Sequence, residues 1–274
     1  MDTDRIAIIG GGNLGSALAN GLTASGRRPR SAVTITRRTE QALEPLRREG
    51  FQTTTDNRAA IRGASVVIVA VRPAQLGSVL DEIAEALDSA TQVVVSTVTN
   101  VSIAAMTARL PEQTEVLRAM PNIGVAVGES MTCLACATKT PQTTRDRIAK
   151  LFNELGLAQF IEEEQMTPAT SLCACGIAFF LRAIRAASQG GVQVGFHADE
   201  AIRLAAQTAK GAAELILELG EHPESLVDSV TTPLGVTIAG LNEMEHQGFS
   251  SAMIRGIVVS AEKALRLSGD APTA

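Results

Sequence analysis

The sequence predicts an α/β fold in which an N-terminal, doubly wound sheet is followed by an all-α C-terminal domain. Over residues 1–162, short apolar runs rich in β-branched residues alternate with patterns of helical periodicity, as in a sheet covered by helices. The first of these units holds a glycine motif between its strand and its helix. Strand patterns end at the acidic run of residues 162–164, and alanine-rich helical patterns follow. We therefore expect two domains, residues 1–162 and residues 163–274.

The glycine motif lies in residues 10–15, which read GGGNLG. A strand is expected at residues 5–9 and a helix at residues 16–25, with Gly26 placed to end the helix. The first glycine suits a tight turn, the second lets the backbone approach a pyrophosphate, and the third lets helix and strand pack closely. The spacing alone is weak, but between a strand and a helix it is typical of a Rossmann-type dinucleotide-binding domain. The cofactor residues expected in this turn are Gly10, Gly12, Asn13, Leu14 and Gly15.

The remaining elements follow from periodicity and from signals at helix ends. Further strands are expected at residues 33–36, 66–71, 93–98, 115–120, 131–137 and 158–161. Helices are expected between them at residues 40–49, 74–87, 102–110 and 141–155. In the second domain, helices are expected at residues 168–194, 198–221, 237–247 and 250–268, with Pro223 and Pro233 marking breaks.

The end of the second strand indicates which dinucleotide binds. An NAD site needs an acidic residue about 20 residues after the glycines to hold the ribose hydroxyls. Thr36, Arg37 and Arg38 stand there instead. Two guanidinium groups and neighbouring hydroxyls suit a 2′-phosphate, so we expect NADP(H) rather than NAD. The alternative is that the two arginines belong to an ordinary solvated loop.

Composition limits the kinds of partner. The 274 residues carry a formal net charge of -5 and have a pI near 5.4, and they contain no basic stripe for nucleic acid or an anionic membrane. We expect a small-molecule partner, no nucleic acid and no membrane. The N-terminus shows no signal-peptide pattern, and the most apolar later stretch, residues 172–181, is cut short by Arg182 and Arg185. The protein is therefore expected to be cytoplasmic.

The cysteines and histidines do not predict a metal site. The cysteines form two pairs, at positions 133 and 136 and at positions 173 and 175, which invites a zinc interpretation. Both pairs lie in apolar sequence without a Gly- or Pro-rich knuckle, where reduced thiols act as small hydrophobic groups. The scattered histidines fit surface or helix-capping roles, and they are His197, His222 and His246. We expect no metal.

Several motifs along nearly the whole chain resemble those of one family. After the GGGNLG turn come Asn57, the segment AVRP at residues 70–73, STVTN at residues 96–100, and RAMPN at residues 118–122, the most specific match. Residues 190–195, 205–211, 222–230 and 237–249 continue the pattern in the helical domain. On these motifs the chain resembles the pyrroline-5-carboxylate reductases, which make proline from a cyclic imine. The further cofactor residues that this resemblance implies are Asn57, Ala70, Val71, Arg72, Pro73, Thr99 and Asn122.

The chain departs from the family pattern where it resembles the substrate loops. Residues 173–179, CACGIAF, stand for SGSGPAY, and residues 232–237, TPLGVT, stand for SPGGTT. Leu234 replaces a glycine and Ile177 a proline, so we expect a narrower or reshaped cradle for a substrate carboxylate. The substrate residues that the resemblance implies are Cys175, Gly176, Gly235, Val236 and Thr237. Thr237 is the candidate catalytic hydroxyl donor; the alternative is that it caps the helix it begins.

The resemblance implies NADPH-dependent reduction of a cyclic imino acid, most directly of 1-pyrroline-5-carboxylate to L-proline, in proline biosynthesis. An imine that binds in its protonated form needs only positioning and one hydroxyl donor. Two alternatives remain: a reductase of a related imine or oxo-acid, and a non-catalytic NADP-binding regulatory paralogue. We also expect a homodimer or higher homo-oligomer through the C-terminal helices, because residues 173–187 and 201–219 are apolar over more than one face.

Overall fold

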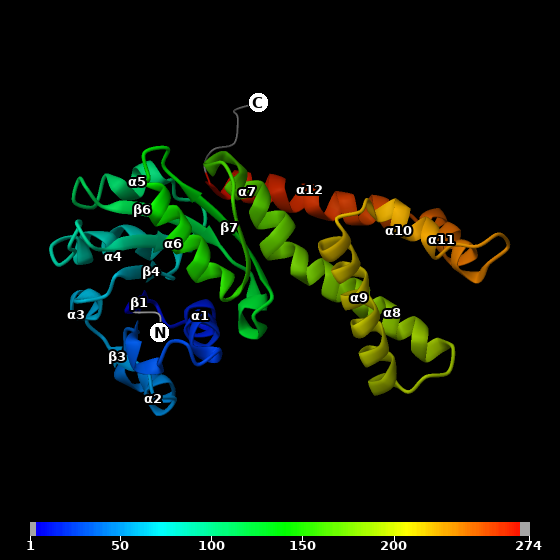
Figure 1. The fold of residues 1–274 in the computed structure, drawn as a ribbon, viewed down its shortest axis with the longest axis horizontal. Coiled ribbons are helices and arrows are strands. Elements are labelled where there is room, and N and C mark those ends of the chain that lie inside the picture. Colours follow the sequence, from blue (N-terminus) through cyan, green and yellow to red (C-terminus); the bar gives the residue numbers. More distant parts are fainter. Residues whose placement is uncertain (1–3, 269–274) are drawn as a thin grey trace. The chain divides into compact units, whose positions relative to one another are not determined.

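The structure, a computed structural model, describes residues 4–268 of the chain (Figure 1). The described residues divide into two compact units, residues 4–174 with 261–268 and residues 175–260. The first unit is a sheet covered by helices, and the second is built from helices alone. The predicted fold class is therefore confirmed. The domain boundary after residue 162 stays a prediction.

The first unit contains one mixed sheet of eight strands within the described residues. Its strands are β1 (Ile6–Ile9), β2 (Val33–Thr36), β3 (Gln52–Thr54), β4 (Val66–Val69), β5 (Val93–Ser96), β6 (Glu115–Met120), β7 (Ser130–Cys136) and β8 (Gly156–Phe160). The order across the sheet is β3-β2-β1-β4-β5-β6-β7-β8, and β1 to β6 are parallel. The order reverses between β1 and β4, which is where a doubly wound sheet binds its ligand.

β7 departs from this parallel arrangement. It pairs antiparallel with β6 and parallel with β8. β6 and β7 are joined through a short 3-10 segment, η2 (Ile123–Val127), and a link of this length cannot make the crossover that a parallel neighbour needs. The doubly wound sheet thus gains two further strands on the side of β6.

The helices of the first unit lie close to their expected positions. They are α1 (Asn13–Ala24), α2 (Glu40–Arg48), α3 (Asn57–Ile61), α4 (Pro73–Ala84), α5 (Ile103–Thr107), α6 (Gln142–Asn153) and α7 (Met166–Ala169), with the 3-10 segments η1 (Arg30–Ala32) and η3 (Glu163–Gln165). The sequence pattern does not predict β3 or α3. β3 is a polar strand of three residues at the sheet edge, and α3 has five residues, so neither is long enough for its periodicity to repeat.

Each face of the sheet carries its own apolar core. Along β1, Ala7 and Ile9 pack into one core, while Ile6 and Ile8 pack into the other. Residues from α3, α4 and α5 complete the first core, and residues from α1, α2 and α6 complete the second. Strands covered on both faces read as continuous apolar runs, and this is why their positions could be predicted.

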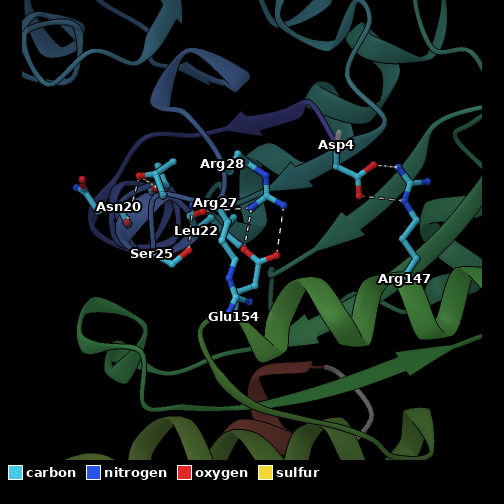
Figure 2. Close-up of polar contacts among 10 residues, drawn as sticks. Asp4, Asn20, Leu22, Ser25, Arg27, Arg28, Arg147 and Glu154 are labelled. Atoms are coloured by element: carbon cyan, nitrogen blue, oxygen red, sulfur yellow. Dashed lines mark hydrogen bonds and ion pairs between the residues drawn. The ribbon is translucent and has the colours of Figure 1, made fainter. Parts of the chain in front are cut away.

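Two ion pairs join the N-terminal part of this unit to α6 and the residue that follows it (Figure 2). The fully buried Arg28 side chain donates to the carboxylate of Glu154 at 3.0 Å. Arg147 on α6 donates to Asp4, just before β1, at 2.6 Å. Burial alone would raise the pKa of Asp4, but hydrogen bonds from Arg147 and Ser65 outweigh it and hold that pKa below its usual value. Both pairs fix α6 against the first βα unit.

The second unit is helical. It contains α8 (Gly176–Gln193), α9 (Ala198–Leu219), α10 (Pro223–Ser229), α11 (Val236–His246) and the first part of α12 (Phe249–Ser268). α8 continues from α7 through a π-helical segment, η4 (Thr170–Cys175). The sequence does not predict α10: Pro223 begins this helix rather than only breaking the chain. His222 caps α10, because its Nδ1 accepts the N–H of Glu224 at 3.2 Å, and a capping role is confirmed for this histidine.

Candidate functional site

The glycine turn joins β1 to α1. Gly10 has φ 105°, in the left-handed region, and a Cβ on it would lie 2.6 Å from the carbonyl oxygen of Ala70. A Cβ on Gly15 would collide with the carbonyl oxygen of Gly10. Only glycine fits either position, so β1, α1 and the end of β4 can approach closely. This geometry supports the expected roles of Gly10 and Gly15 in the tight turn and the close packing.

Gly12, unlike Gly10 and Gly15, lies next to open space, because a Cβ on it would meet no atom within 4 Å. It is the N-cap of α1, no side chain caps the helix there, and its first turn contains no acidic residue. α1 begins at Asn13, three residues earlier than expected, so Asn13 and Leu14 belong to its first turn. An uncapped helix N-terminus with open space before it suits a pyrophosphate. The residues present therefore fit the phosphates of a dinucleotide.

Thr36, Arg37 and Arg38 lie at the carboxyl end of β2, the neighbour of β1 in the sheet. The buried Thr36 hydroxyl accepts the N–H of Gly10 at 3.2 Å, so it supports the glycine turn. The half-buried Arg37 donates to the carbonyl oxygen of Ala42 at 3.2 Å. Arg38 is exposed, and no hydrogen bond or ion pair joins its side chain to the described residues. Arg37 is thus held by a hydrogen bond, whereas Arg38 makes no such contact with the described residues. Two neighbouring guanidinium groups of this kind fit a 2′-phosphate.

The remaining expected loop residues lie after β4 and β5, at the same edge of the sheet as the glycine turn. They are Ala70, Val71, Arg72 and Pro73 after β4, and Thr99 after β5. Pro73 is the first residue of α4, where its fixed φ suits the helix start. Thr99 precedes Asn100, which has φ 65° and lies in a region that few residues other than glycine adopt. Because parallel strands end at a common edge, these loops surround the space before α1.

Two expected cofactor asparagines are engaged within the chain. Asn57, the first residue of α3, donates its side-chain amide to Glu82 at 2.8 Å. Asn122, after β6, accepts the N–H of Gly124 at 2.8 Å and donates to the carbonyl oxygen of Cys173 at 3.2 Å. Both polar ends of the Asn122 side chain therefore bind the backbone of the first unit. This asparagine positions the loop between β6 and β7.

Arg118 is a residue of the RAMPN segment to which the sequence assigned no role. Its side chain is 8% exposed and pairs with Glu163 at 3.2 Å. Glu163 also accepts the backbone N–H of Ile103 at 2.7 Å. The pair therefore links β6, η3 and the start of α5. The signal for it is an arginine between the apolar residues Leu117 and Ala119 of β6, because a buried cation needs a partner.

The expected substrate residues lie in the second unit, in two segments of different structure. Cys175 ends η4 and Gly176 begins α8, so both lie inside one continuous helical run. Gly235 is the N-cap of α11, and Val236 and Thr237 are its first two residues. No side chain caps this helix start. The N–H groups of its first turn therefore suit a carboxylate.

The loop before α11 keeps a tight turn despite Leu234. The N–H of Gly235 donates to the carbonyl oxygen of Thr232 at 2.9 Å, and Leu234 adopts φ 59°, a conformation that favours glycine. The Leu234 side chain is fully exposed, so it does not fill the turn within this unit. Gly235 rather than Thr237 is the N-cap, so the capping alternative for Thr237 is wrong. No hydrogen bond joins the Thr237 hydroxyl to the described residues.

The cysteines are free thiols. Cys133 is buried, Cys136 and Cys173 are half-buried, and Cys175 is exposed. The expected role of a small hydrophobic group therefore fits Cys133 best and Cys175 least. Within residues 4–268, no group of three or more His, Cys, Asp or Glu side chains could hold a metal ion.

The glycine turn with its open helix start, the arginines after β2 and the following helical unit are features typical of the class of NADP-dependent oxidoreductases. A family model described as NADP oxidoreductase, coenzyme F420-dependent, matches residues 5–100. A second, described as pyrroline-5-carboxylate reductase dimerisation, matches residues 163–267. Together with the relatives below, these matches show that the chain belongs to the pyrroline-5-carboxylate reductase family.

Two similar relatives come from Dictyostelium discoideum. Pyrroline-5-carboxylate reductase 1 is 48% identical over 96% of this chain and 49% of its own length, and pyrroline-5-carboxylate reductase 2 is 44% identical over 94% of this chain and 91% of its own length. The chain thus spans about half the length of the first relative.

Solved structures show the same fold. A pyrroline-5-carboxylate reductase from Coxiella burnetii aligns over 97% of this chain and 99% of its own, with a TM-score of 0.88 and 26% identity. The Plasmodium falciparum pyrroline carboxylate reductase, solved with NADP bound, aligns over 98% of this chain and 99% of its own, with a TM-score of 0.85 and 22% identity. At 22% identity, the similarity to the Plasmodium falciparum structure shows a shared fold alone.

One helical run in the described residues, Glu163–Gln193, is long and apolar enough to cross a membrane by length and composition. Only 11% of its most apolar window is buried. A single run of this kind is weak evidence for a membrane span. The dimerisation family model covers the same residues, which gives their exposed apolar surface a second explanation, contact with another copy of the chain.

Proposed function

We propose that this chain reduces 1-pyrroline-5-carboxylate to L-proline with NADPH in the cytoplasm. Relatives named for this activity match almost the whole chain at 48% and 44% identity. The observation that carries the proposal is the open, uncapped start of α1 at Gly12. A helix start of this kind supports binding of the dinucleotide phosphates that the proposal requires.

The residues of the first unit bind and orient the cofactor in this proposal. NADPH supplies the hydride when it is bound. The N-terminus of α1 holds its pyrophosphate, Arg37 and Arg38 hold its 2′-phosphate, and the loops after β4 and β5 shape the rest of the pocket. Thr36 and Asn122 act by positioning, since the first supports the glycine turn and the second fixes the loop after β6.

The start of α11 recognises the substrate carboxylate in this proposal. Its uncapped N–H groups and the turn at Gly235 support this role, and Cys175 and Gly176 complete the substrate segment. Residues 173–179 and 232–237 contain no acid, lysine or histidine. An imine that binds already protonated needs none of them, because its carbon accepts hydride directly. The hydroxyl of Thr237 is then the proposed side-chain donor.

We further propose that residues 163–274 form the second domain and assemble the chain into a homodimer. The dimerisation family model matches residues 163–267, and large apolar side chains of α8 and α9 are exposed in the single chain. Phe180 is 60% exposed and Leu217 is 68% exposed. Another copy of the chain would cover them.

The test follows the absorbance of NADPH on addition of 1-pyrroline-5-carboxylate, with L-proline measured at the end. We expect steady oxidation of NADPH with one proline formed for each NADPH consumed. Reactions without the imine, and with NADH in place of NADPH, are the controls. Tight binding of NADPH in a titration, with no oxidation on addition of the imine, would instead support the regulatory alternative and overturn the proposal.

A related imine is the second candidate, and Leu234 favours it. The chain places a fully exposed leucine in a left-handed turn position beside the start of α11, where it adds apolar surface that a glycine lacks. The same assay with a six-membered cyclic imino acid separates the two substrates. A higher kcat/KM for the six-membered ring would replace the proposed substrate while leaving the reaction type unchanged.

A further inference from the structure

A pair of thiols lies in the first unit, away from the glycine turn. Cys133 is on β7 and Cys173 is on η4, 40 residues later, and their Sγ atoms are 3.8 Å apart. Cys133 is 4% exposed and belongs to the apolar core that α3, α4 and α5 cover. Cys173 is half-buried and packs against the same core. One residue of the pair thus lies inside the core, and the other lies at its edge.

The contact makes the two sulfurs chemically unequal. The hydrogen bond with Cys133 lowers the pKa of Cys173 to about 7, although burial opposes this shift. The same hydrogen bond raises the pKa of Cys133, and burial and the charge of Cys173 raise it further. A thiolate rather than a thiol is the nucleophile. Cys173 is therefore the reactive member at neutral pH, and Cys133 is a protonated thiol held next to it.

We propose that Cys133 and Cys173 form a reversible oxidation site that takes a hydroperoxide as its co-reactant and ends in an intramolecular disulfide. In the first step, the Cys173 thiolate attacks one peroxide oxygen, the O–O bond breaks, and the sulfur becomes a sulfenic acid while hydroxide leaves. In the second step, the Cys133 sulfur attacks that sulfur, the S–O bond breaks, and the thiol proton leaves with the oxygen as water. The hydroxide takes up a proton from solvent, the one that Cys173 lost on forming its thiolate. The two thiols thus lose two electrons, and hydrogen peroxide is reduced to two waters.

Formation of the disulfide requires β7 or η4 to move. The sulfurs have to close from 3.8 Å to a bond length of about 2.05 Å. β7 lies within the sheet, whereas Cys173 lies in a π-helical segment, which is an irregular turn that can adjust more readily than a strand. The movement therefore falls on η4. It pulls on the carbonyl of Cys173, which accepts the Asn122 amide at 3.2 Å, and so reaches the loop after β6.

A consequence for turnover rests on the proposed function. Asn122 positions a loop on the cofactor side, and Cys175, the last residue of η4, is an expected substrate residue. We therefore expect oxidation to lower the rate of imine reduction. Cytosolic disulfides, where they occur, are usually transient and redox-sensing, which fits a reversible site of this kind.

Cys136 provides the matched control. It lies three residues after Cys133 on β7 and packs against the opposite core, on the other face of the sheet. A thiol on that face cannot reach Cys173. The Cys136→Ser protein should therefore oxidise like the natural chain, whereas Cys133→Ser and Cys173→Ser should not form the bond.

The experiment treats the reduced full chain with hydrogen peroxide, alkylates the remaining thiols and identifies linked peptides by mass spectrometry. We expect two of the four thiols to disappear, a peptide pair joined through Cys133 and Cys173, and full recovery on addition of dithiothreitol. Cys133→Ser should instead retain a Cys173 sulfenic acid that dimedone traps. If Cys133→Ser, at the buried position, fails to fold, then Cys173→Ser, at the half-buried position, still tests whether loss of one thiol prevents the linkage.

Linkage of Cys173 to Cys175, linkage of Cys133 to Cys136, or loss of no thiol would overturn the proposal. The linkage is read without turnover, so an inactive protein that forms the bond overturns the proposed function and not this site. An active protein that never forms the bond overturns this site and not the proposed function. If imine reduction is measured, peroxide should lower it in the natural chain and in Cys136→Ser, and dithiothreitol should restore it.

Discussion

The two units differ in how much apolar surface they bury by themselves. In the first, helices cover both faces of the sheet, and every residue of β1 and β4 is buried. In the second, Ala201 is the only buried hydrophobic residue between positions 175 and 260, a range that the structure describes completely. Large apolar side chains are exposed there instead, among them Phe180, Leu204, Leu217, Ile254 and Val259.

This difference shows which of the expected site residues are held in place by their own unit. The glycine turn rests on a closed core, so the cofactor residues are positioned by the chain alone. The segment from Gly235 to Thr237 belongs to helices whose apolar faces remain open. Open faces of this extent mark an interface, so we expect the substrate residues to be fixed only when another copy completes the packing.

The largest effect should come from breaking the buried ion pair of the first unit. Glu154→Ala removes the carboxylate that the fully buried Arg28 guanidinium contacts at 3.0 Å, and loss of this buried pair should cost about 3 kcal/mol of unfolding free energy. The matched control is Arg109→Ala, which removes an exposed pair with Asp81 at 2.8 Å and should cost less than about 1 kcal/mol. Urea unfolding of both variants measures the contrast. Equal losses would contradict the view that burial makes the first pair important.

The second prediction tests the open unit. Leu217→Asp places a charge on the exposed face of α9 and should weaken dimerisation by about 100-fold, because a buried charge without a partner is unfavourable. Leu157→Asp, at a position 52% exposed on β8 of the first unit, is the control and should leave the dimer intact. Sedimentation at micromolar concentration reads the result. A Leu217→Asp protein that still forms dimers would show that this face of α9 is not the interface.

The third prediction concerns the edge of the closed unit that holds the cofactor. Replacing Arg37 and Arg38 by alanine should weaken NADPH binding by about 10- to 100-fold and leave NADH nearly unchanged, since only NADPH carries the 2′-phosphate. Arg62→Ala, at an exposed arginine just after α3, controls for the loss of positive charge. Titration with each cofactor measures the effect. Equal weakening for both cofactors would show that the arginines attract both by their charge and do not bind the 2′-phosphate.

The last of these predictions concerns the start of α11, where a single hydroxyl is removed. Thr237→Ala should lower kcat by about 10- to 100-fold, because one hydroxyl hydrogen bond is worth about 1 to 3 kcal/mol. Folding stability should be nearly unchanged, because Gly235 is the N-cap. Thr237→Ser keeps the hydroxyl and should restore most of the rate. If both variants lose the same activity, the methyl group rather than the hydroxyl matters.

Most of the fold could be predicted because its strands are buried on both faces. β4 and β5 contain almost only valine and isoleucine, and such runs are visible without any contact information. The short elements β3, α3 and α10 could not be predicted, since each is too short to show a clear repeating pattern. The direction of β7 depends on the length and path of its link from β6, which hydrophobic periodicity does not report.

The site divides in the same way. The glycine turn could be predicted because φ 105° at Gly10 and the close contact of Gly15 require glycine. The internal contacts of Asn122 and the Cys133–Cys173 pair could not, because they join residues 51 and 40 positions apart. Only the packing of η4 against β7 brings these residues together.

The most direct test of the account is the fate of the hydride. The chain would be given 1-pyrroline-5-carboxylate and NADPH with deuterium at both C4 positions, and the proline would be analysed by mass spectrometry and NMR. The account predicts one deuterium per proline, at the ring carbon that was double-bonded to nitrogen. Proline without deuterium, or no proline while NADPH remains bound and unoxidised, would contradict it.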